Sequence, residues 1–125
     1  MPVKRFNKKS KYNNKKRIYK GIRFDSLKEL RRYKVLELLV LAGEIENLEV
    51  QPVFVLQEMF KHAGRTHRKI SYKADFRYTK EGITIIEDVK SDITAKEPLY
   101  KVKMKLFIFK YIASSNGKVK FIELN

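Results

Sequence analysis

The sequence contains no cysteine, only three prolines and no long hydrophobic run. The lack of cysteine excludes disulfide bonds and thiolate metal sites, and it makes a reducing cytoplasm the expected location. No apolar segment approaches the roughly 20 residues that a membrane-spanning helix needs. The basic N-terminal stretch is followed by no apolar segment of the kind found in signal peptides, so we expect no membrane association.

Acidic residues are scarce, and they are missing altogether from the N-terminal segment. Lysine and arginine number 29 against 14 acidic residues, which gives a formal net charge of +15. Residues 1–20 carry nine of these cations. A solvated charge run is one interpretation, but so unbalanced a segment favours a nucleic-acid partner. We expect residues 1–18 to form a flexible basic arm and residues 19–125 to form a single domain.

Hydrophobic periodicity and turn signals predict an α/β fold. Ser26 is a good N-cap for a helix over residues 27–41, and Pro98 suits the first turn of a second helix that runs to about residue 114. Strands are predicted at residues 17–24, 48–56, 70–78, 83–90 and 119–124, with a polar loop over residues 57–69.

Three chemically active side chains lie on two neighbouring predicted strands. Asp75 lies on the first strand, and Asp88 and Lys90 stand two residues apart on the next. Residues i and i+2 of a strand point to the same face, so Asp88 and Lys90 project together. A lysine beside two acids on apolar strands is an unusual arrangement for stability alone. It suits phosphodiester cleavage, in which carboxylates hold Mg²⁺ and a lysine orients or polarises the attacking water.

This pattern of an acid, a variable gap and (Asp/Glu)-x-Lys resembles the PD-(D/E)XK, or restriction-endonuclease-like, nuclease superfamily. The resemblance implies a central mixed β-sheet flanked by helices. It also implies Mg²⁺, replaceable by Mn²⁺, held by Glu29, Asp75, Asp88 and the carbonyl of Val89. Lys90 would position the attacking hydroxide and offset the developing charge on the phosphate.

The resemblance covers roughly residues 19–110. The order of the segments is similar to a small phage-encoded branch of the superfamily and to the nuclease subunit that cuts transposon ends in heteromeric transposases. The segments that carry this likeness are Phe24-Asp25-Ser26, Gln51-Pro52, Asp75-Phe76 and Glu87-Asp88-Val89-Lys90.

Glu29 has two interpretations. It stands three residues after Ser26, where the partner in a capping box stands. It also lies on one helical stripe with Tyr33 and Leu36, which directs it toward the core, where a glutamate needs a partner. The resemblance adds a metal-binding role, because many PD-(D/E)XK enzymes complete their site with a glutamate from the first helix.

The turn between the two catalytic strands decides which residue faces Asp75. With a connection of two or four residues, Asp75 faces Ile86 and shares a face with Asp88 one diagonal step away. With a three-residue loop and a bulge at Gly82, Asp75 faces Glu87 instead. We prefer Asp88 as the ligand because only Asp88 stands two residues before the lysine.

Two further basic segments are candidate DNA contacts. The polar loop holds Arg65, Arg68 and Lys69 beside two histidines, and it would either contact DNA or simply be solvated. The C-terminal helix carries a lysine patch that is expected to bind the phosphate backbone, and the resemblance places Lys103 at the scissile phosphate. The complete set of predicted DNA contacts is Lys4, Arg5, Lys8, Lys9, Lys15, Lys16, Arg17, Lys20, Arg65, Arg68, Lys69, Lys101, Lys103 and Lys105.

The C-terminal helix has two apolar stripes. One consists of Leu99, Val102, Leu106, Phe109 and Ala113, and the other of Tyr100, Met104, Phe107 and Tyr111. One stripe can enter the core, and we expect the second stripe, with Phe107, to form a homodimer interface. Core packing on both faces is the alternative.

These features predict a Mg²⁺-dependent DNA endonuclease, and the resemblance favours a phage-type Holliday junction resolvase that acts in DNA recombination. Two alternatives belong to other classes. One is a nuclease subunit that works only inside a larger complex, and the other is a DNA-binding protein without catalytic activity. Dependence on a second protein would reveal the first alternative, and a lack of metal dependence would reveal the second.

Overall fold

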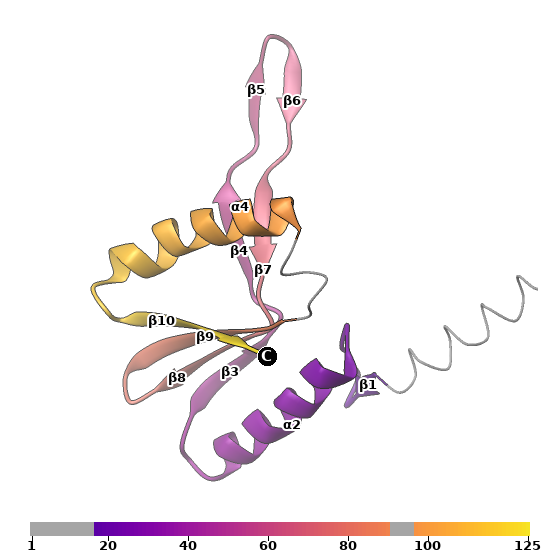
Figure 1. Ribbon diagram of the computed structural model, residues 1–125, viewed down its shortest axis with the longest axis vertical. Helices are drawn as coiled ribbons and strands as arrows, with labels where there is room; N and C mark the ends of the chain where they lie inside the picture. Colours follow the sequence, from indigo (N-terminus) through magenta and orange to yellow (C-terminus); the bar gives the residue numbers. More distant parts are fainter. Residues whose placement is uncertain (1–16, 91–96) are drawn as a thin grey trace, which may run out of the picture.

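The computed structural model describes residues 17–90 and 97–125. Most of the predicted basic arm lies outside the described residues, together with six predicted DNA contacts: Lys4, Arg5, Lys8, Lys9, Lys15 and Lys16. The described chain consists of short strands and two main helices (Figure 1).

The elements follow one another in the order β1 (Ile18–Tyr19), β2 (Ile22–Arg23), α2 (Leu27–Leu41), β3 (Glu46–Val50), β4 (Val53–Gln57), β5 (Phe60–His62), β6 (Arg65–His67), β7 (Ile70–Lys73), β8 (Phe76–Lys80), β9 (Ile83–Val89), α4 (Pro98–Phe107) and β10 (Val119–Leu124). A π-helical segment, Ile108–Ile112, and a 3₁₀ turn, Ala113–Ser115, continue α4. The predicted boundaries of α2 are confirmed, and the single strand predicted over residues 17–24 is the small hairpin β1–β2.

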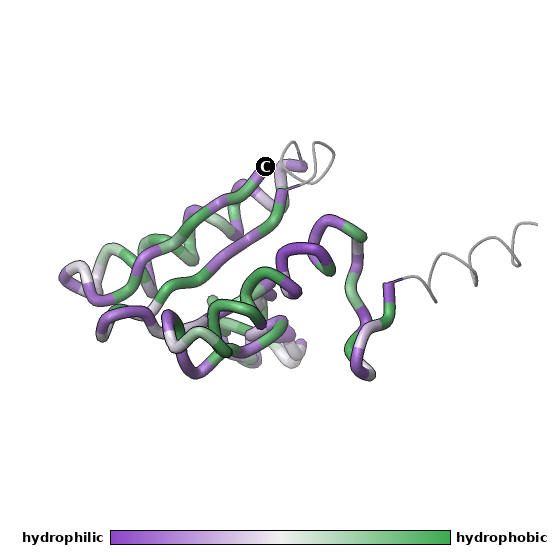
Figure 2. Tube along the Cα trace, turned by 90° about the horizontal axis from the view of Figure 1, so that it is seen from below, coloured by the Kyte–Doolittle hydropathy of each residue, from purple (hydrophilic) through white to green (hydrophobic). Residues whose placement is uncertain are grey.

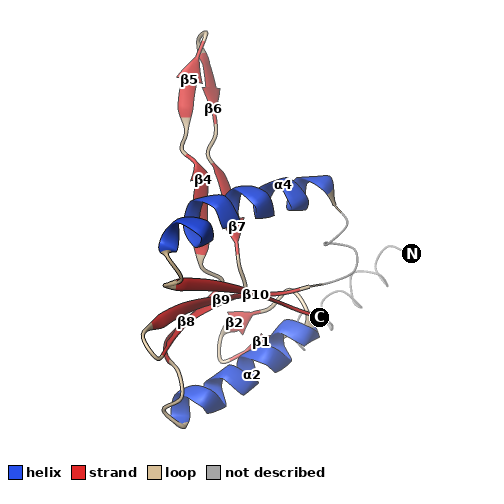
Figure 3. Cartoon of the chain, turned by 60° about the vertical axis from the view of Figure 1, so that its left-hand side comes forward, coloured by secondary structure: helices blue, strands red, loops and turns tan. Residues whose placement is uncertain are grey.

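The central sheet has the strand order β10-β9-β8-β3. Strand β10 runs parallel to β9, whereas β8 pairs antiparallel with both β9 and β3. Helices α2 and α4 lie on opposite faces of this sheet (Figures 1 and 3). The fold is therefore mixed α/β, as predicted. Neither helix, nor any other in the described residues, is long and apolar enough to cross a membrane.

Each helix covers its own apolar core. On the α2 side the buried residues are Phe24, Leu30, Leu36, Ile45, Phe76 and Tyr78. On the α4 side they are Phe54, Tyr72, Ala74, Ile86, Met104 and Phe107. Figure 2 shows hydrophobic residues spaced along both helices and along the strands between them. The sheet is thus an apolar layer on both faces, and the polar residues that interrupt it need a specific explanation.

Phe107 lies in the core of the chain, so its predicted place at a dimer interface is wrong. Its side chain is fully buried, and its ring centroid lies 5.0 Å from that of Phe54 and 4.8 Å from that of Tyr72. The other stripe of α4 faces outward instead. Its exposed members are Leu99, Val102, Leu106 and Phe109, of which Phe109 is 77% exposed.

Two strands that were predicted as continuous are each bent in the middle. The bend lies at Gln51-Pro52 on one strand and at Ala74-Asp75 on the other. The Gln51 N–H donates to the Asp75 carbonyl at 2.8 Å, and the Ala74 N–H donates to the Pro52 carbonyl at 3.0 Å, so pairing continues across the bend. Beyond the bend, β4 and β7 lead into the hairpin β5–β6, which replaces the predicted polar loop.

Candidate active site

The turn between β8 and β9 brings Asp75 next to Asp88. Phe76 pairs with Glu87 and Lys80 pairs with Ile83, so the turn has two residues, Glu81 and Gly82, both with positive φ. This register is neither of the two predicted, because a turn that pairs Asp75 with Ile86 is centred on Lys80-Glu81 and the observed turn lies one residue later. Asp75 directly precedes Phe76 and Asp88 directly follows Glu87, so the two aspartates lie opposite each other at the ends of neighbouring strands.

Glu87 points to the opposite face of the sheet. Its carboxylate is fully buried and accepts two hydrogen bonds from Arg32, at 2.8 Å and 2.7 Å, and a further one from the Tyr78 hydroxyl. A bidentate arginine pair with a tyrosine donor satisfies a buried carboxylate completely. Glu87 therefore belongs to the packing between α2 and the sheet, and Asp88 is the acid that reaches the cavity.

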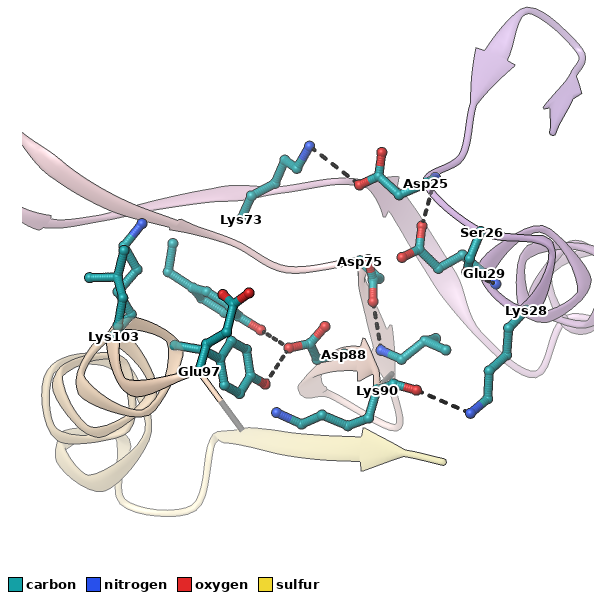
Figure 4. Close-up of a pocket in the computed structure, with 14 residues that line it drawn as sticks. Asp25, Ser26, Lys28, Glu29, Lys73, Asp75, Asp88, Lys90, Glu97 and Lys103 are labelled. Carbon is teal, nitrogen blue, oxygen red and sulfur yellow. Dashed lines mark hydrogen bonds and ion pairs between the residues drawn. The ribbon is translucent and has the colours of Figure 1, made fainter. Parts of the chain in front are cut away.

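A cavity of about 690 Å³ lies between α2, the bend before β8, the end of β9 and α4. All four predicted catalytic residues line it, and Figure 4 shows Glu29, Asp75 and Asp88 directed toward the same hollow from different elements. The described lining residues are Asp25, Ser26, Lys28, Glu29, Tyr72, Lys73, Asp75, Asp88, Val89, Lys90, Glu97, Leu99, Tyr100 and Lys103.

Glu29 accepts a backbone N–H just before the helix, one residue earlier than a capping box would have it, and also lines the cavity with the two aspartates. The Ser26 hydroxyl oxygen accepts the N–H of Glu29 at 3.1 Å, and the Glu29 carboxylate accepts the N–H of Asp25 at 3.1 Å. Glu29 is only 9% exposed, and its charge helps to raise the pKa of Asp75. The two interpretations of Glu29 are thus compatible, because the first turn of α2 begins at the cavity wall.

Protein donors hold both aspartates in place. The Val89 N–H donates to Asp75 Oδ2 at 2.6 Å, and the hydroxyls of Tyr72 and Tyr100 donate to Asp88 Oδ2 at 2.6 Å and 2.7 Å. Burial, followed by the nearby Asp88, raises the pKa of Tyr72, so this hydroxyl keeps its proton and remains a donor. Asp88 is oriented by tyrosines from two different elements, β7 and α4.

Asp75 and Glu29 retain protons more strongly than the same acids in water. Burial raises the pKa of Asp75 to about 9, with further contributions from the hydrogen bond with Asp88 and the charge of Glu29. Burial is also the main cause that raises the pKa of Glu29. A bound divalent cation would relieve the same repulsion that the protons relieve, and these hard oxygen donors are the type that Mg²⁺ prefers.

In this structure the acids bond to other protein groups, Asp75 to the Val89 N–H and Asp88 to two tyrosine hydroxyls. Within residues 17–90 and 97–125, no group of three or more His, Cys, Asp or Glu side chains is arranged to hold a metal ion. Because the pKa of Asp75 is raised, binding an ion would require Asp75 to lose its proton, so affinity for the ion should rise with pH.

Lys90 lines the cavity with little exposure to solvent. Its ammonium group lies 3.5 Å from the centroid of the Tyr100 ring and forms an ion pair with Glu123 of β10, and its side chain is 10% exposed. The ammonium of Lys28 donates to the Lys90 carbonyl at 3.1 Å. An aromatic ring and a carboxylate together hold this lysine in a defined position at the cavity wall.

The remaining predicted DNA contacts are spread over several surfaces. Lys103 lines the cavity, whereas Lys101 and Lys105 are exposed on α4 outside that lining. Arg65, Arg68 and Lys69 are exposed on or beside the hairpin β5–β6. Near the N-terminus, Lys20 forms an ion pair with Glu37 at 2.9 Å, and Arg17 donates to the Asp25 carbonyl.

Comparison with known proteins identifies the family. A family model described as a protein of unknown function (DUF1064) matches residues 9–122. The chain belongs to this family. No curated protein and no solved structure matches the chain. The family description names no activity, so the functional conclusion depends on the residues of the cavity.

Several cavity residues were not predicted from the sequence. Lys28 and Lys73 add cations beside the acids, Glu97 adds a carboxylate, and Tyr72 and Tyr100 orient Asp88. The position of Lys73, two residues before Asp75 on the same predicted strand, is a signal that the sequence contained. The tyrosines carried no such signal, because buried aromatic residues on strands and helices are ordinary core components.

Proposed function

We propose that the chain is a Mg²⁺-dependent DNA endonuclease with a restriction-endonuclease-like core. The observation that carries this proposal is the meeting of Glu29, Asp75, Asp88 and Lys90 in one cavity, although they come from α2, the bend before β8, and the end of β9. Three acids beside a lysine are costly to bury for stability alone. They suit a reaction in which a cation and a phosphate share the same cavity.

Each residue has a distinct role in the proposed reaction. Glu29, Asp75 and Asp88 would hold Mg²⁺, with Mn²⁺ able to replace it, and the Val89 carbonyl would add a ligand. When bound, the ion would polarise the phosphate and lower the pKa of a bound water. Lys90 would place its positive charge against the phosphate as negative charge develops there.

The neighbouring residues support these roles. Tyr72 and Tyr100 donate to one oxygen of Asp88 and leave its other oxygen for the ion. Lys28, Lys73 and Lys103 surround the acids with cations that would bind the phosphates on either side of the scissile bond. Positive charge at this rim would also draw the polyanionic substrate into an acidic site.

We infer that the substrate is branched DNA, such as a Holliday junction, and that the protein acts as a homodimer in DNA recombination. The net charge of +15 favours a DNA partner, and two sites related by a two-fold axis would cut symmetric strands of a junction. The expected location is the cytoplasm, or the host cytoplasm for a phage-encoded protein.

A nuclease subunit that works inside a larger complex is the second candidate. Large apolar side chains of α2 and of the π-helical segment after α4 face outward: Leu38 is 65% exposed, Leu41 83% and Phe109 77%. Such residues are typical of surfaces that another protein covers. This candidate predicts cleavage only when a second protein is present.

A cleavage assay on a panel of DNA substrates tests both candidates. Duplex, flap, fork and four-way junction DNA would be incubated with the purified chain and Mg²⁺, Mn²⁺ or Ca²⁺. We expect cleavage of branched DNA with Mg²⁺ and Mn²⁺, and its loss in Asp88→Asn, which keeps the size of the side chain. Binding without cleavage under every metal condition would contradict an autonomous nuclease, and equal cleavage by Asp88→Asn would contradict the site.

A further inference from the structure

The hairpin β5–β6 projects from the body of the molecule (Figures 1 and 3). Every residue from Gln57 to Ile70 is exposed, so the hairpin contributes nothing to either apolar core. An isolated two-stranded hairpin is marginally stable in water. A projecting ribbon of this kind therefore needs an explanation outside the stability of the fold.

Charge and chemistry on the ribbon suit a nucleic acid. From residue 58 to residue 69 it carries four cations, Lys61, Arg65, Arg68 and Lys69, against the single acid Glu58. Two histidines add hydrogen-bonding groups, and the ring of His67 stacks on that of Phe60 at 4.6 Å between centroids. Cations in such excess over acids on an exposed element form a binding surface for phosphates.

The two faces of the ribbon differ. Phe60 pairs with His67 and His62 pairs with Arg65, and these pairs share one face because they are two residues apart along each strand. The pair Lys61 and Thr66 lies on the other face. One face thus presents groups that hydrogen-bond to base edges, and the other presents one lysine.

The dimensions of the ribbon match one groove of duplex DNA. Two paired strands are about 4.8 Å apart, and with side chains they fill a groove about 12 Å wide, which is the width of the major groove. The minor groove, about 6 Å wide, is too narrow for such a ribbon.

We propose that the hairpin β5–β6 enters the major groove of a duplex arm of the substrate, with the face of His62 and Arg65 toward the bases. Arg65, beside the tip, is suited to the O6 and N7 acceptors of guanine. Lys61 on the opposite face reaches the phosphate backbone. This inference rests on the proposed function only in assuming that the partner is DNA, and it adds how that DNA is contacted.

The chain connects the hairpin to the cavity through one strand. From Gly64 at the tip, β6 and β7 lead to Asp75, which corresponds to about 35 Å of extended backbone. One turn of duplex DNA measures about 34 Å. The ribbon would therefore contact the major groove within about ten base pairs of the phosphate in the cavity, and it would set the direction of that duplex arm.

Methylation protection on a four-way junction tests this inference. The inactive variant Lys90→Met would be bound to the junction without divalent metal and treated with dimethyl sulfate, which methylates guanine N7 in the major groove and adenine N3 in the minor groove. We expect guanine N7 to be protected in one arm, within one turn of the branch point. Replacement of residues 58–69 by Asn-Gly should abolish that protection, because it removes the ribbon. The fold should be retained, because the replaced residues are all exposed.

Point variants separate base contact from general attraction. Arg65→Ala should remove the guanine protection, whereas the matched Lys61→Ala should weaken binding at every sequence and leave the protection pattern unchanged. If the protein binds the junction at no defined position, a competition experiment on linear duplex DNA tests the inference. The inference requires that methyl green, a major-groove ligand, displaces the protein and that netropsin, a minor-groove ligand, does not.

The outcomes distinguish this inference from the proposed activity. Protection of adenine N3 alone, or an unchanged footprint after hairpin replacement, would overturn the inference and leave the nuclease proposal intact. A hairpin-dependent guanine footprint on a protein that cuts nothing would support the inference and overturn the nuclease proposal. Failure of the full chain to bind any DNA would overturn both.

Discussion

Lys90 is the residue whose replacement tests the proposed chemistry most directly. Lys90→Met keeps an apolar stem against Tyr100 and removes the charge that the reaction needs. We expect cleavage to fall by at least ~100-fold with DNA affinity nearly unchanged, because the charge acts mainly in the transition state. Single-turnover cleavage and equilibrium binding measure the two effects. The matched control is Lys120→Met, an exposed lysine on β10 that neither lines the cavity nor belongs to the predicted DNA contacts. Cleavage by Lys90→Met at the wild-type rate would contradict the assignment.

Asp75 links the site to the pH dependence of stability. Burial raises the pKa of Asp75 to about 9, above its value of about 3.9 in the unfolded chain. Between these values the folded state binds more protons than the unfolded state, so the free energy of unfolding falls as pH rises. In the absence of divalent metal, we expect a lower melting temperature at about pH 8 than at about pH 5, and a smaller decline in Asp75→Asn.

The same variant tests metal binding. The side-chain amide oxygen introduced by Asp75→Asn can still accept the Val89 N–H, so the fold should be retained. Mg²⁺ should raise the melting temperature of the wild type, more strongly at high pH, and should have little effect on the variant. Identical pH profiles and Mg²⁺ responses in the two proteins would show that Asp75 does not control the site.

At the level of elements, α4 and its continuation present two aromatic residues in opposite environments. Phe107 is fully buried among the rings of the core, and Phe109 is 77% exposed. Phe107→Ala should therefore lower the free energy of unfolding by about 3–5 kcal/mol, and Phe109→Ala should change it by less than ~0.5 kcal/mol in a monomer. Urea denaturation of both variants measures this difference, and equal losses would contradict the orientation of α4.

For the whole molecule, the basic N-terminal segment should set the salt dependence of DNA binding. Deleting residues 1–16 removes seven cations. The slope of log affinity against log salt should become shallower by up to ~6 if every cation neutralises a duplex phosphate, and by less if only some of them do. Binding titrations with the inactive Lys90→Met protein, with and without the segment, measure the slope. An unchanged slope would show that the segment does not touch DNA.

Homodimer formation remains a prediction, and the structure changes which residues can test it. The outward stripe of α4, with Leu106 and Phe109, now replaces Phe107 as the expected contact. Phe109→Glu should dissociate a dimer without the loss of core packing that Phe107→Glu would cause. Sedimentation at micromolar concentration measures the oligomeric state. A monomeric wild type would favour the partner-dependent nuclease over the junction resolvase.

Local signals in the sequence were sufficient for features that depend on a few neighbouring residues. The Ser26 cap and the helical spacing that follows it predicted α2 with its observed bounds, because caps and periodicity act within one or two turns. The alternation of strand residues placed Asp88 and Lys90 on one side, and both line the cavity. The charge of residues 1–20 and the choice of Asp88 over Glu87 also followed from the sequence by itself.

Only the tertiary structure decided features for which local signals were balanced. Both stripes of α4 are apolar, so periodicity alone did not rank them, and the fit of Phe107 among Phe54, Tyr72 and Phe121 selects the buried one. A two-residue turn at Glu81-Gly82 set a register that the sequence left open, since one residue of slip inverts the faces of a strand. The tyrosines on Asp88 come from β7 and α4, and residues that distant in the chain meet only through the packing of helix on sheet.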